Sequence, residues 1–378
     1  MRAVVVGGSL AGVTAVDELR RQGWDGSITL VGEEPRAAYT RPPLSKGVLK
    51  GTEDADSVAL PKLGPDVEVL TGVRAAGLDP DARLVRIEDG IAGGTENPYD
   101  TEIPYDKLVI ATGARARTLG EHGLVLRTLD DALRLRAELA RAGSVLVVGG
   151  GFLGMEIASV AAELGRQVTV VDVQAPFVTT LGPFLAGLFE RATRDHGVRT
   201  VMCPDGVTPT PYGAQLADGR RLEADLVVTA VGCRPNSEWL EGSGLALLGG
   251  VVVDERCRAG APDVVAVGDV AAFPTGNGRF RRTPHWDAAI SQARSGVAAL
   301  LHGDAAPPYT PQPYFWTEAF GLAVKLAGTL PAAGEPTVLK GSLAGRSALL
   351  RWDHPDRSVT AAALNHRIPV GRLRALAA

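Results

Sequence analysis

Two glycine-rich turns have the residue types and the spacing that bind phosphate groups. The first follows a β-branched run and reads VVVGGSLAG, from Val4 to Gly12. The second reads VLVVGGGFLG, from Val145 to Gly154, and it also opens a stretch with helical spacing. Glycine permits a tight turn and close approach of the backbone to a diphosphate, and a helix N-terminus offers free N–H groups to its charge. The turns therefore indicate binding of two phosphate-containing ligands.

An acidic residue follows each turn at the end of a second apolar strand. SITLVGE ends on Glu33, and QVTVVD ends on Asp172. In dinucleotide-binding folds a carboxylate about 20 residues after the turn hydrogen-bonds to a ribose hydroxyl. Because both strand–turn–helix–strand–acid units are complete, we predict that the chain binds two dinucleotides at once.

The glycines of the two turns have distinct predicted roles. Gly151 lets the backbone approach a pyrophosphate. The first turn departs from the pattern, because it has Ser9 at the corresponding position, but the hydroxyl of Ser9 can still donate a hydrogen bond to a phosphate. A plain strand-to-helix turn is the alternative for residues 7–12. The tight turn and the close packing of helix on strand require the first and last glycines, which are Gly7, Gly12, Gly149 and Gly154.

Composition describes an ordinary globular chain of two or three domains. The 378 residues are 45% hydrophobic and 22% charged. A net charge of −4 counts against general nucleic-acid binding. The first strand starts by Ala3, which leaves no room for a signal peptide, and no apolar run approaches ~18 residues. We therefore expect a cytoplasmic protein with no membrane span.

Cysteine and histidine are placed in ways that predict no metal site. The cysteines are Cys203, Cys233 and Cys257, which form no CxxC pair, and residues 1–202 contain none. The six histidines have no metal-ligand spacing.

Alternating strands and helices must position the two turns. Residues 1–34 have the pattern of strand, helix and strand, and residues 107–114 that of a buried strand ending in a small-residue turn. Residues 225–236 close the second unit in the same way, so the halves form a weak repeat of about 115 residues. The apolar run VVAVGD at 264–269 indicates that the chain returns to the first domain there. Residues 89–101 are predicted to form an exposed hairpin tip.

These motifs together resemble one family over nearly the whole chain. It is the FAD-dependent NAD(P)H:ferredoxin/rubredoxin reductases, which are putidaredoxin reductase-like members of the pyridine nucleotide-disulfide oxidoreductase superfamily. Besides the first turn with Glu33, the resemblance rests on RPPLSK (41–46), IATGA (110–114), LRTLDDALRLR (126–136), VGD (267–269) and YFWTE (314–318).

The resemblance implies an α/β fold with two Rossmann-like dinucleotide-binding domains, as in glutathione reductase, and a small C-terminal α+β domain. The FAD-binding domain is expected in two parts, residues 1–115 and 237–312. Residues 116–236 are expected to form the NAD-binding domain, and residues 313–378 a C-terminal interface domain.

The resemblance also implies the roles of individual residues. Lys46, Glu156 and Trp316 are implied as catalytic residues, with Glu156 close to Lys46 beside the flavin and Trp316 at the nicotinamide side. Glu33 is implied to hold the adenosine ribose of FAD, and Asp269 its ribityl chain. The other implied cofactor-binding residues are Gly7, Ser9, Leu10, Ala11, Gly12, Arg41, Lys46, Ala75, Ala111, Thr112, Gly113, Arg127, Gly268, Trp286, Gly149, Gly151, Phe152, Leu153, Gly154, Asp172 and Gly232.

Several of these residues also fit purely structural roles. Lys46 is equally typical of a solvated loop, and Trp286 and Trp316 of a core. The helix dipole alone favours Glu156 in a first helical turn. A cation fixed by the stiff RPPLSK loop would favour a reduced, anionic flavin. The family often has a glutamate where this chain has Pro284 and a glutamine where it has Ala319.

We therefore predict an NADH-dependent ferredoxin reductase, in which hydride passes from NADH to FAD and single electrons then pass to a 2Fe–2S ferredoxin that supplies an oxygenase. A flavin is required because hydride transfer moves two electrons and the cluster accepts one. An NADH oxidase or peroxidase of the same superfamily is an alternative, although such enzymes carry an early cysteine that residues 1–202 lack. A third possibility is a flavoprotein whose redox state governs partner binding.

The sequence also predicts details of both substrates. Asp172 accepts hydrogen bonds from a ribose 2′-OH but repels a 2′-phosphate, so NADH is expected over NADPH. Because ferredoxins are generally acidic, a local positive patch must dock one, and Arg279, Arg281 and Arg282 are the densest candidate. A solvated loop is the alternative for these arginines.

Overall fold

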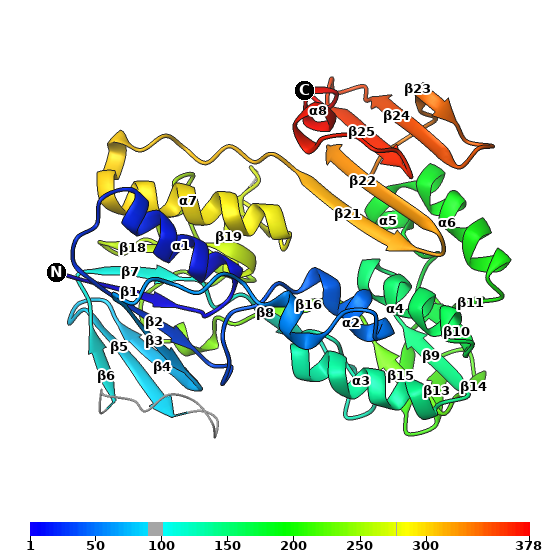
Figure 1. Ribbon diagram of the computed structural model, residues 1–378, viewed down its shortest axis with the longest axis horizontal. Coiled ribbons are helices and arrows are strands. Elements are labelled where there is room, and N and C mark those ends of the chain that lie inside the picture. Colours follow the sequence, from blue (N-terminus) through cyan, green and yellow to red (C-terminus); the bar gives the residue numbers. More distant parts are fainter. Residues whose placement is uncertain (90–100, 277) are drawn as a thin grey trace. The chain divides into compact units, whose positions relative to one another are not determined.

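The computed structural model describes residues 1–89, 101–276 and 278–378, and it divides into two compact units, described separately below (Figure 1). Most of the segment predicted as a hairpin tip, 89–101, lies outside the described residues. Unit 1 contains Met1–Thr40, Val58–Arg115 and Arg234–Pro311; unit 2 contains Arg41–Ser57, Ala116–Cys233 and Gln312–Ala378.

A five-stranded parallel sheet lies at the centre of unit 1, in the order β18-β7-β1-β2-β3. Strand β18, which comes from the VVAVGD segment, pairs with β7 at the edge of this sheet. The strands are β1 (Arg2–Val6), β2 (Ser27–Gly32), β3 (Val67–Thr71), β7 (Lys107–Ile110) and β18 (Val264–Ala266).

Both faces of this sheet are covered, as a parallel sheet requires. Ala3 and Val5 of β1 pack with helices α1 (Leu10–Arg21) and α7 (Trp286–His302). Val4 and Val6 point the other way, into a core shared with an antiparallel sheet. That sheet consists of β4 (Val73–Asp79), β5 (Leu84–Asp89) and β6 (Glu102–Pro104), and a second small sheet consists of β17 (Val251–Val252), β19 (Ala271–Pro274) and β20 (Phe280–Arg282).

Unit 2 repeats the parallel design in a four-stranded sheet of order β11-β10-β9-β15. The strands are β9 (Ser144–Val148), β10 (Gln167–Asp172), β11 (Arg199–Met202) and β15 (Leu226–Thr229). Its helices are α3 (Leu129–Arg141), α4 (Phe152–Glu163), α5 (Val178–Leu181) and α6 (Pro183–Asp195), and β12 (Val207–Thr210), β13 (Gly213–Leu216) and β14 (Arg221–Glu223) form an antiparallel sheet.

The loop that contains RPPLSK belongs to unit 2, although its sequence neighbours belong to unit 1. Its prolines start the 3₁₀ helix η1 (Pro42–Ser45), which runs into α2 (Gly47–Lys50). These two elements pack against α3 and α4. The chain also passes between the units at β8 (Ala114–Ala116) and β16 (Cys233–Pro235), which pair with each other.

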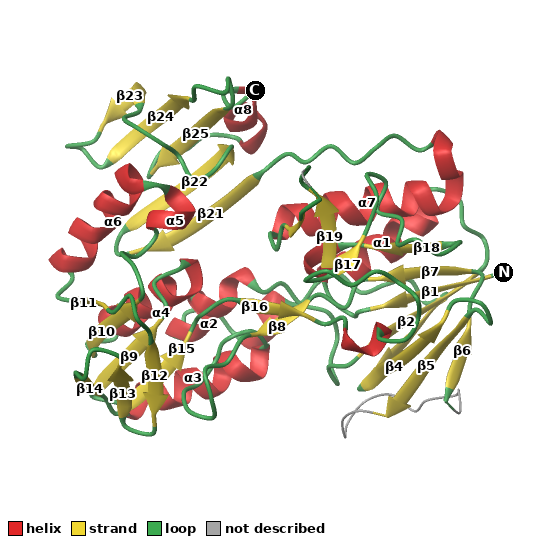
Figure 2. Ribbon diagram, turned by 180° about the vertical axis from the view of Figure 1, so that it is seen from behind, coloured by secondary structure: helices red, strands yellow, loops and turns green. Residues whose placement is uncertain are grey.

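The C-terminal residues of unit 2 form a separate antiparallel sheet of order β21-β22-β25-β24-β23, with one short helix (Figure 2). Helix α8 packs on one face, where Leu373 joins Tyr314, Ala327 and Ala361 in a buried cluster. The other face meets α6, where the rings of Phe184 and Trp352 are 5.9 Å apart. The elements are β21 (Tyr314–Ala319), β22 (Leu322–Gly328), β23 (Thr337–Ser342), β24 (Ser347–Asp353), β25 (Val359–Leu364) and α8 (Val370–Ala375).

Two Rossmann-like sheets and a small C-terminal module confirm the predicted α/β fold class. Across the described residues, no helix has both the length and the apolar character needed to cross a bilayer.

Candidate functional site

The first glycine turn is closely packed where glycine was predicted to be required. Gly7 has φ +126°, and a Cβ there would lie 2.1 Å from the carbonyl oxygen of Ala111. A Cβ on Gly12 would lie 1.9 Å from the carbonyl oxygen of Gly7. Ser9 caps α1 without a side-chain hydrogen bond to the helix, so its hydroxyl leaves the first N–H groups of α1 available to a ligand.

The second turn has the same construction around an open space. A Cβ on Gly149 would lie 2.4 Å from the carbonyl oxygen of Ala230, and one on Gly154 would lie 1.9 Å from that of Gly149. Gly151 is different, because no described atom outside its own neighbours lies within 4 Å of the place where its Cβ would be. Packing therefore explains the outer glycines, whereas Gly151 faces open space at the N-terminus of α4.

Each acidic residue lies at the carboxyl end of the second strand of its sheet. Asp172 ends β10, where its Oδ2 accepts a hydrogen bond from Gly150 N–H at 2.5 Å and its Oδ1 one from Val173 N–H at 2.6 Å. Glu33 follows β2 with 59% of its side chain exposed, and its Oε1 lies 3.8 Å from Nε of Arg74. Both turns thus fit a dinucleotide, with helix N–H groups for its phosphates and a carboxylate for a ribose. Leu10, Ala11, Phe152 and Leu153 lie in the first turns of α1 and α4.

The VGD segment of unit 1 forms a tight turn held by buried polar groups. Gly268 has φ +78°, and its N–H donates to Oε1 of Gln292, a fully buried side chain of α7, at 2.8 Å. Arg282 donates to the backbone carbonyl of Asp269 at 2.9 Å. The main chain on both sides of Asp269 is therefore fixed. The sequence analysis missed Gln292 because nothing local distinguishes it from other helical residues.

The start of α7 lies beside this turn. His285 caps the helix, and burial lowers the pKa of His285, with the Asp269 carboxylate opposing that shift and Arg281 adding to it. Trp286 is 39% exposed and donates from Nε1 to Thr40 Oγ1 at 3.2 Å. Trp286 is therefore a surface residue at a helix start rather than a core aromatic.

The small-residue turn after β7 is pinned by one asparagine. Asn236 donates from Nδ2 to the carbonyl of Thr112 at 2.9 Å and from its backbone N–H to that of Gly113 at 3.0 Å. Thr112 Oγ1 donates back to the Asn236 carbonyl at 2.6 Å. Ala111 is buried at the end of β7, and the side chain of Ala75 lies in the core behind β4, so only the backbone of Ala75 can touch a ligand.

A buried carboxylate in unit 2 joins three parts of the chain. Glu156, 5% exposed, accepts hydrogen bonds on Oε2 from Lys46 Nζ at 2.7 Å and Ser45 Oγ at 2.5 Å. Its Oε1 accepts one from Thr317 Oγ1 at 2.9 Å, with the backbone N–H of Glu318 at 3.4 Å. The structure thus brings Lys46 and Glu156 together as the resemblance implied. We call these five residues the Glu156 cluster.

Sequence reasoning identified the motifs of this cluster but not two of its donors. Ser45 lies inside RPPLSK and Thr317 inside YFWTE, so the motifs themselves were the available signal. Trp316 alternates with Phe315 and Thr317 along β21 and therefore lies on the opposite face of the sheet, 6.0 Å from the ring of Tyr314. Phe315 instead contacts Phe152 at the start of α4, with ring centroids 4.9 Å apart.

The remaining predicted residues of unit 2 lie in loops near the helices. Arg41 donates from Nη1 to the carbonyl of Arg127 at 2.7 Å, and the N–H of Arg127 donates to Asp131 at 2.9 Å. Gly232 has φ +99°, and its carbonyl accepts from Arg117 N–H at 3.0 Å.

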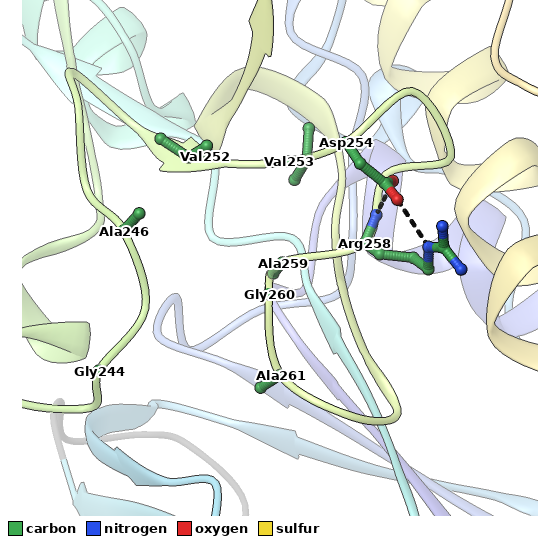
Figure 3. Close-up of a pocket in the computed structure, with 9 residues that line it drawn as sticks. All are labelled: Gly244, Ala246, Val252, Val253, Asp254, Arg258, Ala259, Gly260 and Ala261. Carbon is green, nitrogen blue, oxygen red and sulfur yellow. Dashed lines mark hydrogen bonds and ion pairs between the residues drawn. The ribbon is translucent and has the colours of Figure 1, made fainter.

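One open pocket in unit 1 lies away from the predicted residues (Figure 3). Its only charged lining residues are Asp254 and Arg258, which pair at 2.6 Å and so leave no unsatisfied charge for a ligand. It is lined by Gly244, Ala246, Val252, Val253, Asp254, Arg258, Ala259, Gly260 and Ala261.

Comparisons with known proteins show which proteins this chain is similar to. The chain is 35% identical to rhodocoxin reductase of Rhodococcus erythropolis, an alignment that covers 91% of this chain and 81% of the relative. It is 31% identical to the ferredoxin–NAD(+) reductase component of the 3-phenylpropionate/cinnamic acid dioxygenase of Photorhabdus laumondii, over 99% of this chain and 95% of the relative.

Its fold also matches the reductase in the crystal structure of the covalent putidaredoxin reductase–putidaredoxin complex. The TM-score is 0.83 at 30% sequence identity, over 96% of this chain and 89% of that one. The sequence pattern described as pyridine nucleotide-disulphide oxidoreductase matches residues 1–293. Two glycine turns shaped for dinucleotides and a match over most of its length place this chain in the pyridine nucleotide-disulphide oxidoreductase family.

Proposed function

We propose that this chain is an NADH-dependent flavoprotein reductase that supplies single electrons to a 2Fe–2S ferredoxin, which in turn supplies an oxygenase. The observation that carries the proposal is the pair of glycine turns, each with its outer glycines packed against carbonyl oxygens and a carboxylate beside the turn. Relatives named as ferredoxin reductases support the choice of electron acceptor. The chain is an oxidoreductase with two nucleotide sites and a protein substrate.

FAD is the cofactor that we assign to the first turn and NADH the substrate of the second. Bound FAD accepts two electrons from a nicotinamide and releases them one at a time. In unit 1 the N-terminus of α1 would hold the diphosphate, Glu33 the adenosine ribose, and Asp269 the ribityl chain. In unit 2 the N-terminus of α4 would hold the diphosphate of NADH and Asp172 its adenosine ribose.

The Glu156 cluster would keep one positive charge at a fixed point. Lys46 is anchored through Nζ by the Glu156 carboxylate and by the carbonyl of Pro42 at 3.3 Å, so its ammonium cannot swing away. A cation held in this way stabilises negative charge that develops close to it. We assign Lys46 and Glu156 to that task. Trp316 lies on the face of the C-terminal sheet that is turned away from Glu156.

The compartment that fits this chemistry is the cytoplasm. Cytosolic reductants keep thiols reduced, and no disulfide joins Cys203, Cys233 and Cys257, all three of which lie in the described residues.

The test is reconstitution with purified protein. The purified protein should contain about one FAD per chain. NADH should drive the reduction of a 2Fe–2S ferredoxin, which is monitored as a loss of the visible absorbance of the cluster. Asp269→Ala should weaken retention of FAD far more than Asp172→Ala does, because only Asp269 belongs to the FAD site. Isolation of FMN, or rapid NADH oxidation by oxygen with no ferredoxin reduction, would contradict the proposal.

A further inference from the structure

The turn that carries Asp269 lies where two helices of unit 1 meet. Gly268 has φ +78°, and a Cβ there would lie 3.0 Å from Cβ of Ala11, in the first turn of α1, and 4.0 Å from Cβ of Ala289 on α7. Asp269 therefore follows a glycine that is packed against the start of α1, the helix end that we assign to the diphosphate of FAD. Whatever fixes the main chain of this turn also fixes where the Asp269 side chain starts.

One side of the turn is held by Gln292, whose side chain is fully buried. Its Oε1 accepts the N–H of Gly268 at 2.8 Å, whereas its Nε2 is buried and makes no hydrogen bond within the described residues. Burial raises the pKa of the Tyr309 phenol, and Ser291 and Gln292 oppose that rise, so the phenol lies near the amide without completing a hydrogen bond to Nε2.

The amide of Gln292 is not explained by packing alone. A buried amide with an unsatisfied donor is costly, and methionine would fill a similar space without that cost. The hydrogen bond to the N–H of Gly268 is the contribution that methionine could not make. The position therefore has a glutamine where an apolar side chain would suit the core better.

The other side of the turn is held by Arg282. Its Nη1 donates to the carbonyl oxygen of Asp269 at 2.9 Å, and its stem is closely packed, because a Cβ on Gly250 would lie 2.8 Å from Cδ of Arg282. Arg282 is half-buried, whereas Arg279 and Arg281 are exposed around the short strand β20. The predicted docking patch therefore depends on Arg279 and Arg281, and Arg282 has a partner inside unit 1.

We propose that Gln292 and Arg282 are positioning residues for Asp269 in the binding of FAD. They come from different elements, α7 and β20, and they hold the N–H before Asp269 and the carbonyl oxygen after its Cα. A carboxylate on a main chain that is already fixed loses less conformational freedom when it binds the ribityl hydroxyls. The inference rests on the proposed function, because FAD is the ligand assigned to this turn there.

The experiment is a double-mutant cycle on the affinity for FAD. Gln292→Met removes the acceptor at nearly constant size, Arg282→Met removes the donor and keeps an apolar stem, and each is made with and without Asp269→Ala. FAD-loaded protein is diluted in steps, and the change in flavin fluorescence gives the Kd of FAD. Thr29→Val is the matched control, because it removes a buried hydroxyl elsewhere in unit 1, which donates to Glu68 at 2.7 Å.

In the presence of Asp269, Gln292→Met and Arg282→Met should each raise the Kd of FAD by about tenfold. In the Asp269→Ala background the same changes should raise it by about twofold or less, because residues that act through one partner are not additive with the removal of that partner. Arg282→Lys keeps a cationic donor and should recover most of the affinity that Arg282→Met loses. Thr29→Val should lower the temperature of thermal unfolding, with a change of less than about twofold in the Kd of FAD.

Two results would overturn the assignment and leave both side chains as parts of the core. One is an equal rise in the Kd of FAD with and without Asp269→Ala, and the other is a rise no larger than that of the Thr29→Val control. The Arg282 variants decide the question alone if Gln292→Met does not fold, and no recovery in Arg282→Lys would remove Arg282 from the assignment. Absence of FAD from the unaltered protein would instead overturn the proposed function, and this inference with it.

Discussion

Glu156 shows how a single side chain can fix a site. An ionised carboxylate is costly to bury unless it is paired and hydrogen-bonded. Glu156 meets this requirement through donors from a loop at residues 45–46 and from a strand more than 150 positions later. Ser159, one turn further along α4, also accepts a hydrogen bond from this later segment. Its Oγ accepts the backbone N–H of Phe320 at 2.7 Å. Helix α4 is therefore bound to β21 and the residue that follows it by buried polar contacts.

Replacement of Thr317 by valine should show the importance of the third donor. Thr317 is fully buried, and valine has nearly its shape, but Oε1 of Glu156 would then have only the backbone N–H at 3.4 Å. We expect the free energy of unfolding to fall by about 1–3 kcal/mol, measured by urea denaturation. Thr317→Ser keeps the hydroxyl and should recover most of the loss. Equal stability of the valine variant and the unaltered protein would mean that the hydroxyl contributes nothing to Glu156.

The nucleotide preference is also a property of one residue. Asp172 should favour NADH because its carboxylate repels a 2′-phosphate, and Val173, Gln174, Ala175 and Pro176 bring no cation to offset it. Asp172→Ala should narrow the ratio of the two kcat/KM values by about tenfold, or ~1.4 kcal/mol. The structure adds a complication, since Asp172 also holds Gly150 N–H. Asp172→Asn keeps an acceptor for that N–H and removes only the charge, so a narrowed ratio in both variants identifies repulsion as the cause. A preference for NADPH in the unaltered protein would refute the assignment.

At the scale of elements, the strand–turn–helix unit appears twice with the same construction. In both copies a Cβ on the last glycine would meet the carbonyl oxygen of the first, and a Cβ on the first would meet the carbonyl oxygen of the residue directly after β7 or β15, which is Ala111 or Ala230. The helix can approach its strand only if both positions lack a Cβ. The middle position is not subject to this constraint, which is why it is Ser9 in one copy and Gly151 in the other.

Two alanine substitutions in the second turn should therefore have different effects. Gly154→Ala would place a methyl group 1.9 Å from the Gly149 carbonyl oxygen, so we expect a loss of several kcal/mol of stability or no folded protein. Gly151→Ala meets no described atom within 4 Å and has an ordinary φ of −78°, so thermal unfolding should be almost unchanged. Its KM for NADH should nevertheless rise by about tenfold or more, because the methyl group enters the space kept for the diphosphate. A normal KM for Gly151→Ala would show that this space is not the nucleotide site.

The sequence was a good guide to elements whose signals are local. Each glycine turn leads from a strand into a helix, an acid lies at or just after the end of each second strand, and residues 264–266 pair with the first sheet. Contacts between distant segments were not predictable in the same way. No local signal in the RPPLSK loop predicts that it packs on α3 and α4 rather than on its sequence neighbours in unit 1. This contact depends on surfaces that are formed by residues later in the chain. The roles of Thr317 and Gln292 were missed for the same reason.

At the scale of the whole molecule, two of the three thiols are buried. Cys203 and Cys257 are buried, and burial, with a smaller contribution from Asp254, raises the pKa of Cys257, which keeps that thiol protonated. None of the three cysteines belongs to the Glu156 cluster or to a glycine turn.

Replacing Cys203, Cys233 and Cys257 together by serine should leave the rate of flavin reduction by NADH nearly unchanged. Serine can keep the contacts of the buried pair, from Cys203 Sγ to the Gly206 carbonyl and from Cys257 Sγ to that of Gln292. Stopped-flow measurement on the FAD-loaded variant is the check. A fall of more than about tenfold, ~1.4 kcal/mol in the barrier, would point to the thiol chemistry of an oxidase or peroxidase.

The repeated passage of the chain between the two units has a consequence for synthesis on the ribosome. Domains generally fold as units as they emerge, beginning at the N-terminus. Here strand β7 stays an open edge until β18 emerges at residues 264–266, and the Glu156 carboxylate stays without its Thr317 donor until β21 emerges. Neither unit can be completed early, so a nascent chain of 250 residues exposes a bare parallel edge of the kind that pairs with other chains. We therefore expect fragments truncated before residue 264 to aggregate rather than fold.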